Sequence, residues 1–165
     1  MNRHFYNFVA IFNAAAKTFR SNFSFPLRST YLIKVLFLLY RLGFIRDYTL
    51  PNKWHYNHRG QLVLGKRQSN YYHPVNVTFK TNLFPRIKSV TTPGKRRQYF
   101  FKYKKLLRLH NRLGAMATII VSSSVSRGLC TSSELLAKGK HGGLVLFIVY
   151  HYQDSTRRKE RKTFP

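Results

Sequence analysis

The imbalance between positive and negative charge constrains this chain more than any other feature of its sequence. Thirty lysine and arginine residues face only four carboxylates, Asp47, Glu134, Asp154 and Glu160, and the formal net charge is +26. A compact fold with this charge repels itself unless a partner neutralises it, and ordinary basic surfaces mix the two signs. The composition therefore predicts a polyanionic partner, with a nucleic acid favoured and an anionic membrane as the rival.

The same shortage of carboxylates argues against most enzyme classes. General acid/base pairs and magnesium clusters need carboxylates, and the single cysteine, Cys130, excludes an internal disulfide and a cysteine-rich zinc site. His55 and His58 form an isolated H-x-x-H pair, which is more typical of a loop or an RNA-facing segment than of a metal site. Ser124–Gly128, "SVSRG", has serine where the nucleophile elbow G-x-S-x-G has its first glycine. We therefore expect no catalysis, no metal, no cofactor and no small-molecule substrate.

Helical periodicity predicts two helices in the first part of the chain. The first spans roughly Phe5–Arg20, and "SNFSFP" then interrupts it and is a candidate short strand. The second, "YLIKVLFLLYRLGFI" (Tyr31–Ile45), has 15 residues and carries two basic ones, whereas a membrane span needs roughly 20 apolar residues. It is therefore predicted to be a core helix, capped by Ser29 or Thr30 and ending near Gly43.

The rest of the chain mixes strand and helix patterns. "PNKWHYNHRG" predicts a turn region, and the candidate strands "QLVLG" and "VNVTF" follow it. Farther along, "LLRLHNRLG" predicts a short helix that ends at Gly114. The apolar runs "ATIIVS" and "LVLFIVY" predict buried strands. Hydrophobic residues make up 44% of the chain, which is enough to bury a core in one domain or in two small ones.

The positive charge is concentrated in one segment. Arg86–Arg112 holds ten basic residues and no acidic one. Within it, a Pro-Gly turn at 93–94 is predicted to present Lys95, Arg96 and Arg97. Such a cluster is typical of a surface that faces phosphate groups.

The stretch between the last two predicted strands, "SSSVSRGLCTSSELLAKGKHGG" (Ser122–Gly143), is rich in hydroxyl residues. Thr131 and Glu134 fit a capping box, which predicts a helix over Ser132–Lys138 ended by a glycine. Ser122–Gly128 is then predicted to be the turn from strand to helix, with small hydroxyl side chains and free backbone N–H groups directed outward. A turn of this kind is suited to contact with anions or sugar edges.

This stretch resembles the signature of small-subunit ribosomal protein eight. The family has a strand, then S-T-S-[KR]-G-[VIL]-M-[ST], a short helix, a Gly-Gly doublet and a last strand. Ser124, Ser126, Arg127 and Gly128 match the motif, whereas Val125 replaces its central threonine.

Three other segments, in the same order as in the family, carry the resemblance across about Phe5–Tyr150. "IKSVTTPGKRRQY" is similar to the family's V-S-K-P-G-x-R, and "FPLRSTYLIKVLFLLYRLGFI" is similar to its M-P-S-S-K helix. "IFNA" is similar to R-I-x-N-A, with Asn13 retained and Ala10 in place of the arginine.

The resemblance implies an α+β protein of two small α/β-type domains, 1–85 and 86–153, followed by a basic tail, 154–165. The second domain contains the strand, the Ser-rich turn, the helix, the Gly-Gly doublet and the last strand. The implied function is that of a structural constituent of the small ribosomal subunit, which binds the central domain of small-subunit rRNA and supports assembly beside neighbouring ribosomal proteins. The residues expected at the RNA are Asn13, Arg28, Lys95, Arg96, Arg97, Ser124, Ser126, Arg127, Gly128, Thr131, Gly142 and Gly143.

The resemblance and the composition together indicate a compartment. The first 20 residues are basic and free of acids, as in a mitochondrial leader, but the family's first helix begins near its start, so the helix at Phe5 is expected to belong to the fold. The chain is rich in Phe, Tyr, Asn and Lys, which AT-rich codons favour, and this predicts a protein made inside an organelle. Because family residues are replaced at Ala10, Val125 and Leu144, we expect a mitochondrion, with a plastid as the alternative.

Two other function classes stay open, a non-ribosomal RNA-binding or RNA-processing factor and a peripheral membrane protein. The tail Asp154–Pro165 carries five basic residues and little that can be buried. We expect it to become ordered only against rRNA or a neighbouring protein.

Overall fold

The computed structural model describes residues 3–50, 54–56, 59, 61–64, 74–80, 84–90, 99–126 and 128–151. Along the chain the α-helices and β-strands are α1 (Arg3–Lys17), β1 (Asn22–Pro26), α2 (Thr30–Arg41), β2 (Ile45–Thr49), β3 (Trp54–Tyr56), β4 (Leu62–Leu64), β5 (Pro74–Phe79), β6 (Arg86–Ser89), β7 (Tyr99–Phe101), α3 (Tyr103–Leu113), β8 (Ala117–Ser123), β9 (Gly128–Thr131), α4 (Ser132–Ala137) and β10 (Gly143–Tyr150). Short 3-10 turns cover Gly114–Met116 and Ser124–Ser126. The α+β class predicted from the sequence is confirmed.

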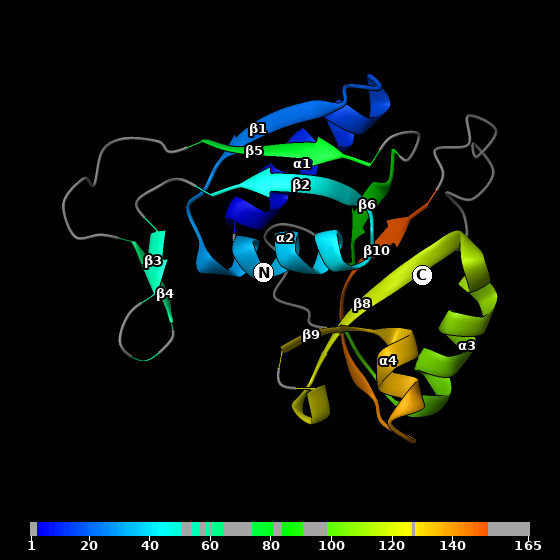
Figure 1. The fold of residues 1–165 in the computed structure, drawn as a ribbon. Helices are drawn as coiled ribbons and strands as arrows, with labels where there is room; N and C mark the ends of the chain where they lie inside the picture. Colours follow the sequence, from blue (N-terminus) through cyan, green and yellow to red (C-terminus); the bar gives the residue numbers. More distant parts are fainter. Residues whose placement is uncertain are drawn as a thin grey trace.

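The first sheet is antiparallel, in the order β1-β5-β2, and lies in the upper part of Figure 1 with α1 and α2. The helix α1 turns an aromatic face toward it, because Phe8 and Phe12 lie about one turn apart on the helix and are buried. The ring centroid of Phe12 lies 5.0 Å from that of Phe79 on β5. The helix ends three residues earlier than predicted, because Phe19 adopts a left-handed backbone conformation with φ +54°.

The helix α2 matches both its predicted start and its predicted end. The Ser29 hydroxyl accepts a hydrogen bond from the N–H of Tyr31, so Ser29 is the cap. The helix stops at Arg41, and Gly43, with φ +78°, turns the chain so that β2 begins at Ile45. The predicted end near Gly43 is therefore confirmed, and Ile45, the last residue of the apolar run, belongs to β2.

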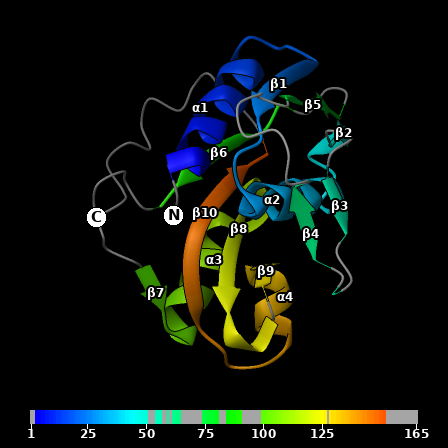
Figure 2. The same ribbon diagram turned by 90° about the vertical axis from the view of Figure 1, so that its left-hand side faces the viewer.

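The second sheet has the order β6-β10-β8-β9, and β7 pairs with β10 beyond the end of β6. Both of its faces are covered. Ile120, Phe147 and Val149 pack with the aromatic core of α1 and α2, whereas Ile119 and Ile148 pack with α3 and α4. In Figure 2, β10 and β8 run through the middle, with α1 and α2 in the upper part of the view and α3 and α4 in the lower part.

A register shift lets β10 serve both cores. It falls between Val145 and Phe147 in the pairing with β8, as a β-bulge does. As a result Leu146 and Phe147, which are neighbours in sequence, both belong to the core of α1 and α2. Val145 and Ile148, on either side of them, belong to the core of α3 and α4.

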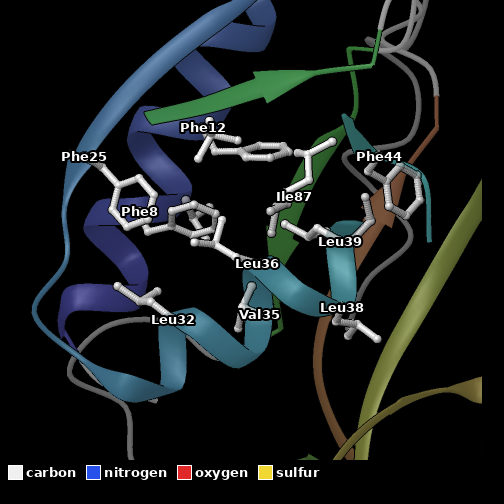
Figure 3. Close-up of a cluster of buried hydrophobic side chains, with 14 of the residues drawn as sticks. Phe8, Phe12, Phe25, Leu32, Val35, Leu36, Leu38, Leu39, Phe44 and Ile87 are labelled. Carbon is white, nitrogen blue, oxygen red and sulfur yellow. The ribbon is translucent and has the colours of Figure 1, made fainter. Parts of the chain in front are cut away.

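The larger core joins the two sheets through α1 and α2. The helix α1 contacts β1 of the first sheet and β6 of the second, and α2 contacts β2 and β9. Figure 3 shows Phe8, Phe12 and Leu36 facing one another, with Ile87 of β6 beside them. Each fully buried side chain of this size contributes about 1.5–3 kcal/mol to the stability of the fold.

The Tyr31 hydroxyl is buried without a hydrogen-bond partner in the described part of the chain, and burial raises the pKa of Tyr31 to about 12.

A side chain of α1 closes the outer edge of β6. The Asn13 Nδ2 donates to the carbonyl oxygen of Ile87, and the Asn13 Oδ1 accepts from the Ile87 N–H, both at 2.8 Å. These two bonds satisfy backbone groups that point away from β10 and would otherwise be left without partners beside the core.

The prediction for the segment after β8 needs correction. Ser122–Gly128 is not a turn from strand to helix, because the strand β9 intervenes before α4 and pairs Leu129, Cys130 and Thr131 with β8. The segment instead contains the end of β8, the turn of a β-hairpin and the first residue of β9. The short strands β2, β6 and β7 were not predicted, and β3 lies in the region predicted as a turn.

The predicted division of the chain at residues 85 and 86 stays a prediction. Sheet membership changes between Phe79 and Arg86, whereas the larger core extends across both sheets. The predicted Pro-Gly turn at 93–94 and the tail at 154–165 lie outside the described residues.

We predict that Asn13→Ala destabilises the protein, because it leaves the N–H and C=O of Ile87 unpaired next to the core. The expected loss is about 1–3 kcal/mol, measured by urea unfolding. Asn7→Ala, at an exposed site on the same helix, is the control and should change stability by less than about 0.5 kcal/mol. Equal small effects from the two substitutions would show that Asn13 does not hold β6.

Candidate nucleic-acid interface

The β8–β9 turn (Ser124–Gly128) lies at one end of the second sheet. Ser124 and Val125 are exposed on the 3-10 turn, and the Val125 side chain is 41% exposed although it is apolar. Gly128 is also exposed and has φ +127°, a conformation that residues with a side chain rarely adopt. Arg127, the basic residue of the motif, lies outside the described residues.

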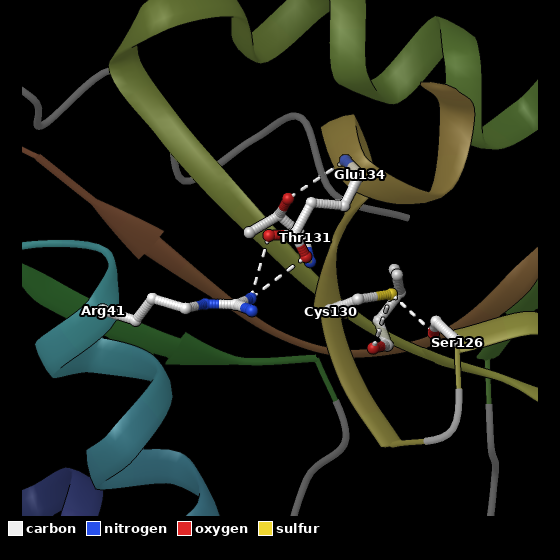
Figure 4. Close-up of polar contacts among 6 residues, drawn as sticks. Arg41, Ser126, Cys130, Thr131 and Glu134 are labelled. Atoms are coloured by element: carbon white, nitrogen blue, oxygen red, sulfur yellow. Dashed lines mark hydrogen bonds and ion pairs between the residues drawn. The ribbon is translucent and has the colours of Figure 1, made fainter. Parts of the chain in front are cut away.

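Serine hydroxyls on either side of Ser124 hold this turn in place. The Ser126 Oγ donates to the Cys130 Sγ at 2.9 Å, as Figure 4 shows, and the Cys130 thiol in turn donates to the Val121 carbonyl. The Ser123 Oγ donates to the Gly142 carbonyl at 3.3 Å and accepts from the Val125 N–H at 3.4 Å. Ser124 is exposed, and its hydroxyl makes no hydrogen bond to another described residue.

This arrangement corrects the expectation that the whole turn offers free groups. The Val125 N–H is occupied by Ser123, and the hydroxyl of Ser126, a predicted RNA contact, is occupied by Cys130. Ser124 and Gly128 keep the exposed positions that their predicted role requires.

Thr131 has a structural role at the start of α4. It is only 5% exposed, and its hydroxyl accepts from the Glu134 N–H while the Glu134 carboxylate accepts from the Thr131 N–H. The capping box predicted from the sequence is therefore confirmed. Because its hydroxyl is buried and engaged, we leave Thr131 out of the interface.

The carboxylate of Glu134 also joins the two halves of the chain. The Arg41 guanidinium of α2 donates to its two oxygens at 2.9 and 3.1 Å (Figure 4). Both side chains are more than 40% exposed, and surface pairs of this kind contribute about 0–1 kcal/mol. The contact orients α4 more than it stabilises the fold.

The Gly-Gly doublet is explained by close packing. A Cβ on Gly142 would collide with the carbonyl oxygen of Phe101 on β7. A Cβ on Gly143 would lie 3.1 Å from the Ser122 carbonyl oxygen and from a methyl group of Leu135. The doublet therefore lets β10 approach its neighbours, and its predicted contact with RNA has no separate support.

Of the other predicted residues, the structure describes Asn13 and Arg28. Asn13 binds β6 at one edge of the second sheet, whereas the turn joins β8 to β9 at the other edge. Arg28 is exposed just before α2. Lys95, Arg96 and Arg97 lie outside the described residues.

Part of the predicted basic segment Arg86–Arg112 forms one face of α3, an arrangement that was not singled out in the sequence. Lys104, Arg108 and Arg112 are all exposed and follow one another at four-residue intervals, so they share one face. The helix predicted from the sequence began at Leu106, whereas α3 begins at Tyr103. Lys104 therefore lay outside the predicted helix, and the row of three basic residues was not recognised. Like charges at this spacing destabilise a helix by about 0.2–0.5 kcal/mol per pair. The four-residue spacing of Lys104, Arg108 and Arg112 in the sequence would have been enough to predict this face.

Two negative findings concern the described residues only. They contain no group of three or more His, Cys, Asp or Glu side chains arranged to hold a metal ion. Among the helices described, none has the length and apolar character needed to cross a membrane.

The sequence was compared with known protein families and with curated proteins. The sequence model of the family described as ribosomal protein S8 matches residues 6–150. No curated protein matches the chain.

We predict that Gly142→Ala destabilises the protein. Where space allows, Gly→Ala stabilises by about 0.4–1 kcal/mol, but here the new methyl group must push β7 away from β10, and overpacking of this kind costs about 1–3 kcal/mol. Thermal or urea unfolding measures whether the substitution raises or lowers the stability of the protein. Lys140→Ala, at an exposed site two residues earlier, is the control, and a stabilising effect of Gly142→Ala would refute the packing argument.

Proposed function

The chain belongs to the ribosomal protein S8 family, and from this premise we propose that it binds the central domain of small-subunit rRNA and supports assembly of the subunit. Family membership makes it a ribosomal protein of the small subunit that binds rRNA beside neighbouring ribosomal proteins. The family consists of structural proteins and not of enzymes. The alternatives, an RNA-processing factor and a peripheral membrane protein, gain no support from it.

The observation that carries the proposed RNA site is the geometry of the β8–β9 turn. Ser124 is exposed on a turn whose flanking hydroxyls, Ser123 and Ser126, are bonded within the protein. An exposed hydroxyl without an internal bond can donate to and accept from a sugar or a base edge without losing one. Because the turn is anchored to β8, β9 and the Gly142 carbonyl, it keeps its shape when the RNA is absent.

The charge of the chain supplies the sequence-independent part of the proposed binding. Each phosphate that a lysine or arginine neutralises releases counterions and adds about 0.7–0.9 to the slope of log affinity against log salt. We propose that Lys95, Arg96, Arg97 and Arg127, which lie outside the described residues, contribute in this way because of their predicted positions beside the Pro-Gly turn and in the motif.

We further propose that the ribosome is mitochondrial, with a plastid as the alternative. The composition, with 14 Phe and 11 Tyr among 165 residues, supports an organelle. The replacement of family residues at Ala10, Val125 and Leu144 supports the mitochondrion over the plastid. The protein is expected to sediment with the small subunit of purified mitochondrial ribosomes in high salt. Its presence in plastid ribosomes, or its release from the subunit by moderate salt, would contradict this assignment.

We predict that Ser124→Ala lowers the preference for the cognate rRNA fragment over an unrelated structured RNA. The loss of one neutral hydrogen bond of about 0.5–1.5 kcal/mol corresponds to roughly 2- to 12-fold in affinity for the cognate fragment. The measurement is a competition titration with the two RNAs at fixed salt.

Two further serine variants serve as comparisons. Ser133→Ala removes an exposed hydroxyl from α4 and should change neither affinity. Ser126→Ala breaks the contact with Cys130 and should weaken binding through a looser turn, with a lower thermal midpoint. If Ser124→Ala lowers the affinity for the cognate and the unrelated RNA equally, this hydroxyl does not contribute to selectivity through a sugar or base edge, and the prediction is wrong.

A further inference from the structure

The helix α3 has one apolar face and one cationic face. Leu106 is fully buried in the core of α3 and α4, and Leu109 and Leu113 pack against the same core. The residues on the other side, Lys104, Arg108 and Arg112, are exposed. Successive members of this row are about 6 Å apart along the helix axis, because four residues each rise 1.5 Å. The row therefore spans two helical turns on a rigid element.

Other lysines extend the cationic face at the start of the helix. Lys102 is the N-cap residue and makes no side-chain capping bond. The Lys105 Nζ lies 4.4 Å from the centre of the Phe101 ring, which fixes this cation beside β7. Figure 1 shows α3 on the outer side of the lower half, with α4 between it and β9.

This arrangement is unfavourable for the isolated protein. Lys104 and Arg108, and then Arg108 and Arg112, are like-charged neighbours at four-residue spacing, which weakens a helix. The lysines at the start of α3 also oppose the helix dipole, whose positive end is there, and the first turn holds no acidic residue.

No described carboxylate offsets these charges. Asp47 lies on β2 and accepts from the Tyr48 N–H. Glu134 is engaged by Arg41 and by the Thr131 N–H. Within the described part of the chain the cations of α3 have no acidic partner, which leaves them available to the anionic groups of another molecule.

We propose that the cationic face of α3 lies along a phosphate backbone of the rRNA, as a second contact separate from the β8–β9 turn. The inference rests on the proposed function, because the RNA is the same one. The chemistry fits a phosphate chain better than a protein surface, since the exposed row holds three cations without an intervening acid or apolar side chain. The contact is independent of base sequence and adds to affinity and salt dependence, whereas the turn adds to selectivity.

The test compares two charge variants of the full chain. The first is the triple variant Lys104→Gln, Arg108→Gln and Arg112→Gln. The matched control is Lys34→Gln, Arg46→Gln and Lys80→Gln, whose residues are exposed on or next to α2, β2 and β5. Each set removes three positive charges, so both variants have a formal charge of +23, which is 26 minus 3. Affinity for the cognate rRNA fragment and for an unrelated RNA is measured at several salt concentrations.

For the α3 variant we expect the slope of log affinity against log salt to fall by about 2, because up to three phosphate contacts of about 0.7–0.9 each are lost. The ratio of the affinities for the two RNAs should stay within about twofold of the ratio for the unaltered chain. The control should lose less than half as much slope. Equal losses in both variants would show that only net charge matters and would overturn the proposal.

Two more readouts distinguish an RNA contact on α3 from a stabilising role of its charges and from a protein partner. The thermal midpoint of the free α3 variant should be unchanged or higher, and a lower midpoint would show that these charges stabilise the fold and would overturn the proposal. An α3 variant that binds RNA normally but fails to join small subunits would overturn it as well, because the face would then belong to a protein partner. If the unaltered chain shows no preference for the cognate fragment, the proposed function fails, whatever the α3 variant does.

Discussion

Burial of β8 and β10 on both faces is the constraint on which the rest of the structure depends. Phe147 of β10 packs against Phe5 of α1, with ring centroids 5.1 Å apart, and the next residue, Ile148, enters the core of α3 and α4. Each such side chain contributes about 1.5–3 kcal/mol, whereas the exposed pair of Arg41 and Glu134 contributes about 0–1 kcal/mol. Hydrophobic contact through this sheet, and not surface charge, therefore holds the two halves of the chain together.

A sheet that is covered on both sides can tolerate unpaired backbone groups only where a side chain satisfies them. Asn13 does this at the β6 edge, and the capping box of Thr131 and Glu134 does it where β9 passes into α4. The bulge after Val145 and the small Gly142 let β10 fit both cores and approach β7. The β8–β9 turn extends from this frame and exposes Ser124.

Patterns that depend on neighbouring residues could be predicted from the sequence. The helix caps at Ser29 and Thr131 and the apolar strands β8 and β10 were all predicted, and the structure confirms them. The strands β2, β6, β7 and β9 have three to five residues each, and strands this short form because of a partner strand and not because of their own residues. The partner of Asn13 is 74 residues away in sequence, so its role in the fold could not be predicted from local patterns. The family motif pointed to Gly142 through its place in the doublet, but the reason for that glycine is its distance from Phe101, which only the fold reveals.

We propose that RNA binds the second half of the chain, at the β8–β9 turn and along α3. The helix α1 and the first sheet pack against that half through the larger core, and we expect them not to contact the RNA. Hydrogen–deuterium exchange of the full chain, with and without a central-domain rRNA fragment, tests it most directly. The account predicts slower exchange on RNA binding in peptides that cover residues 102–113 and 122–131, with no change in peptides that cover β1 and β5. Protection confined to β1, β2 and β5, with unchanged exchange at the turn and in α3, would contradict it.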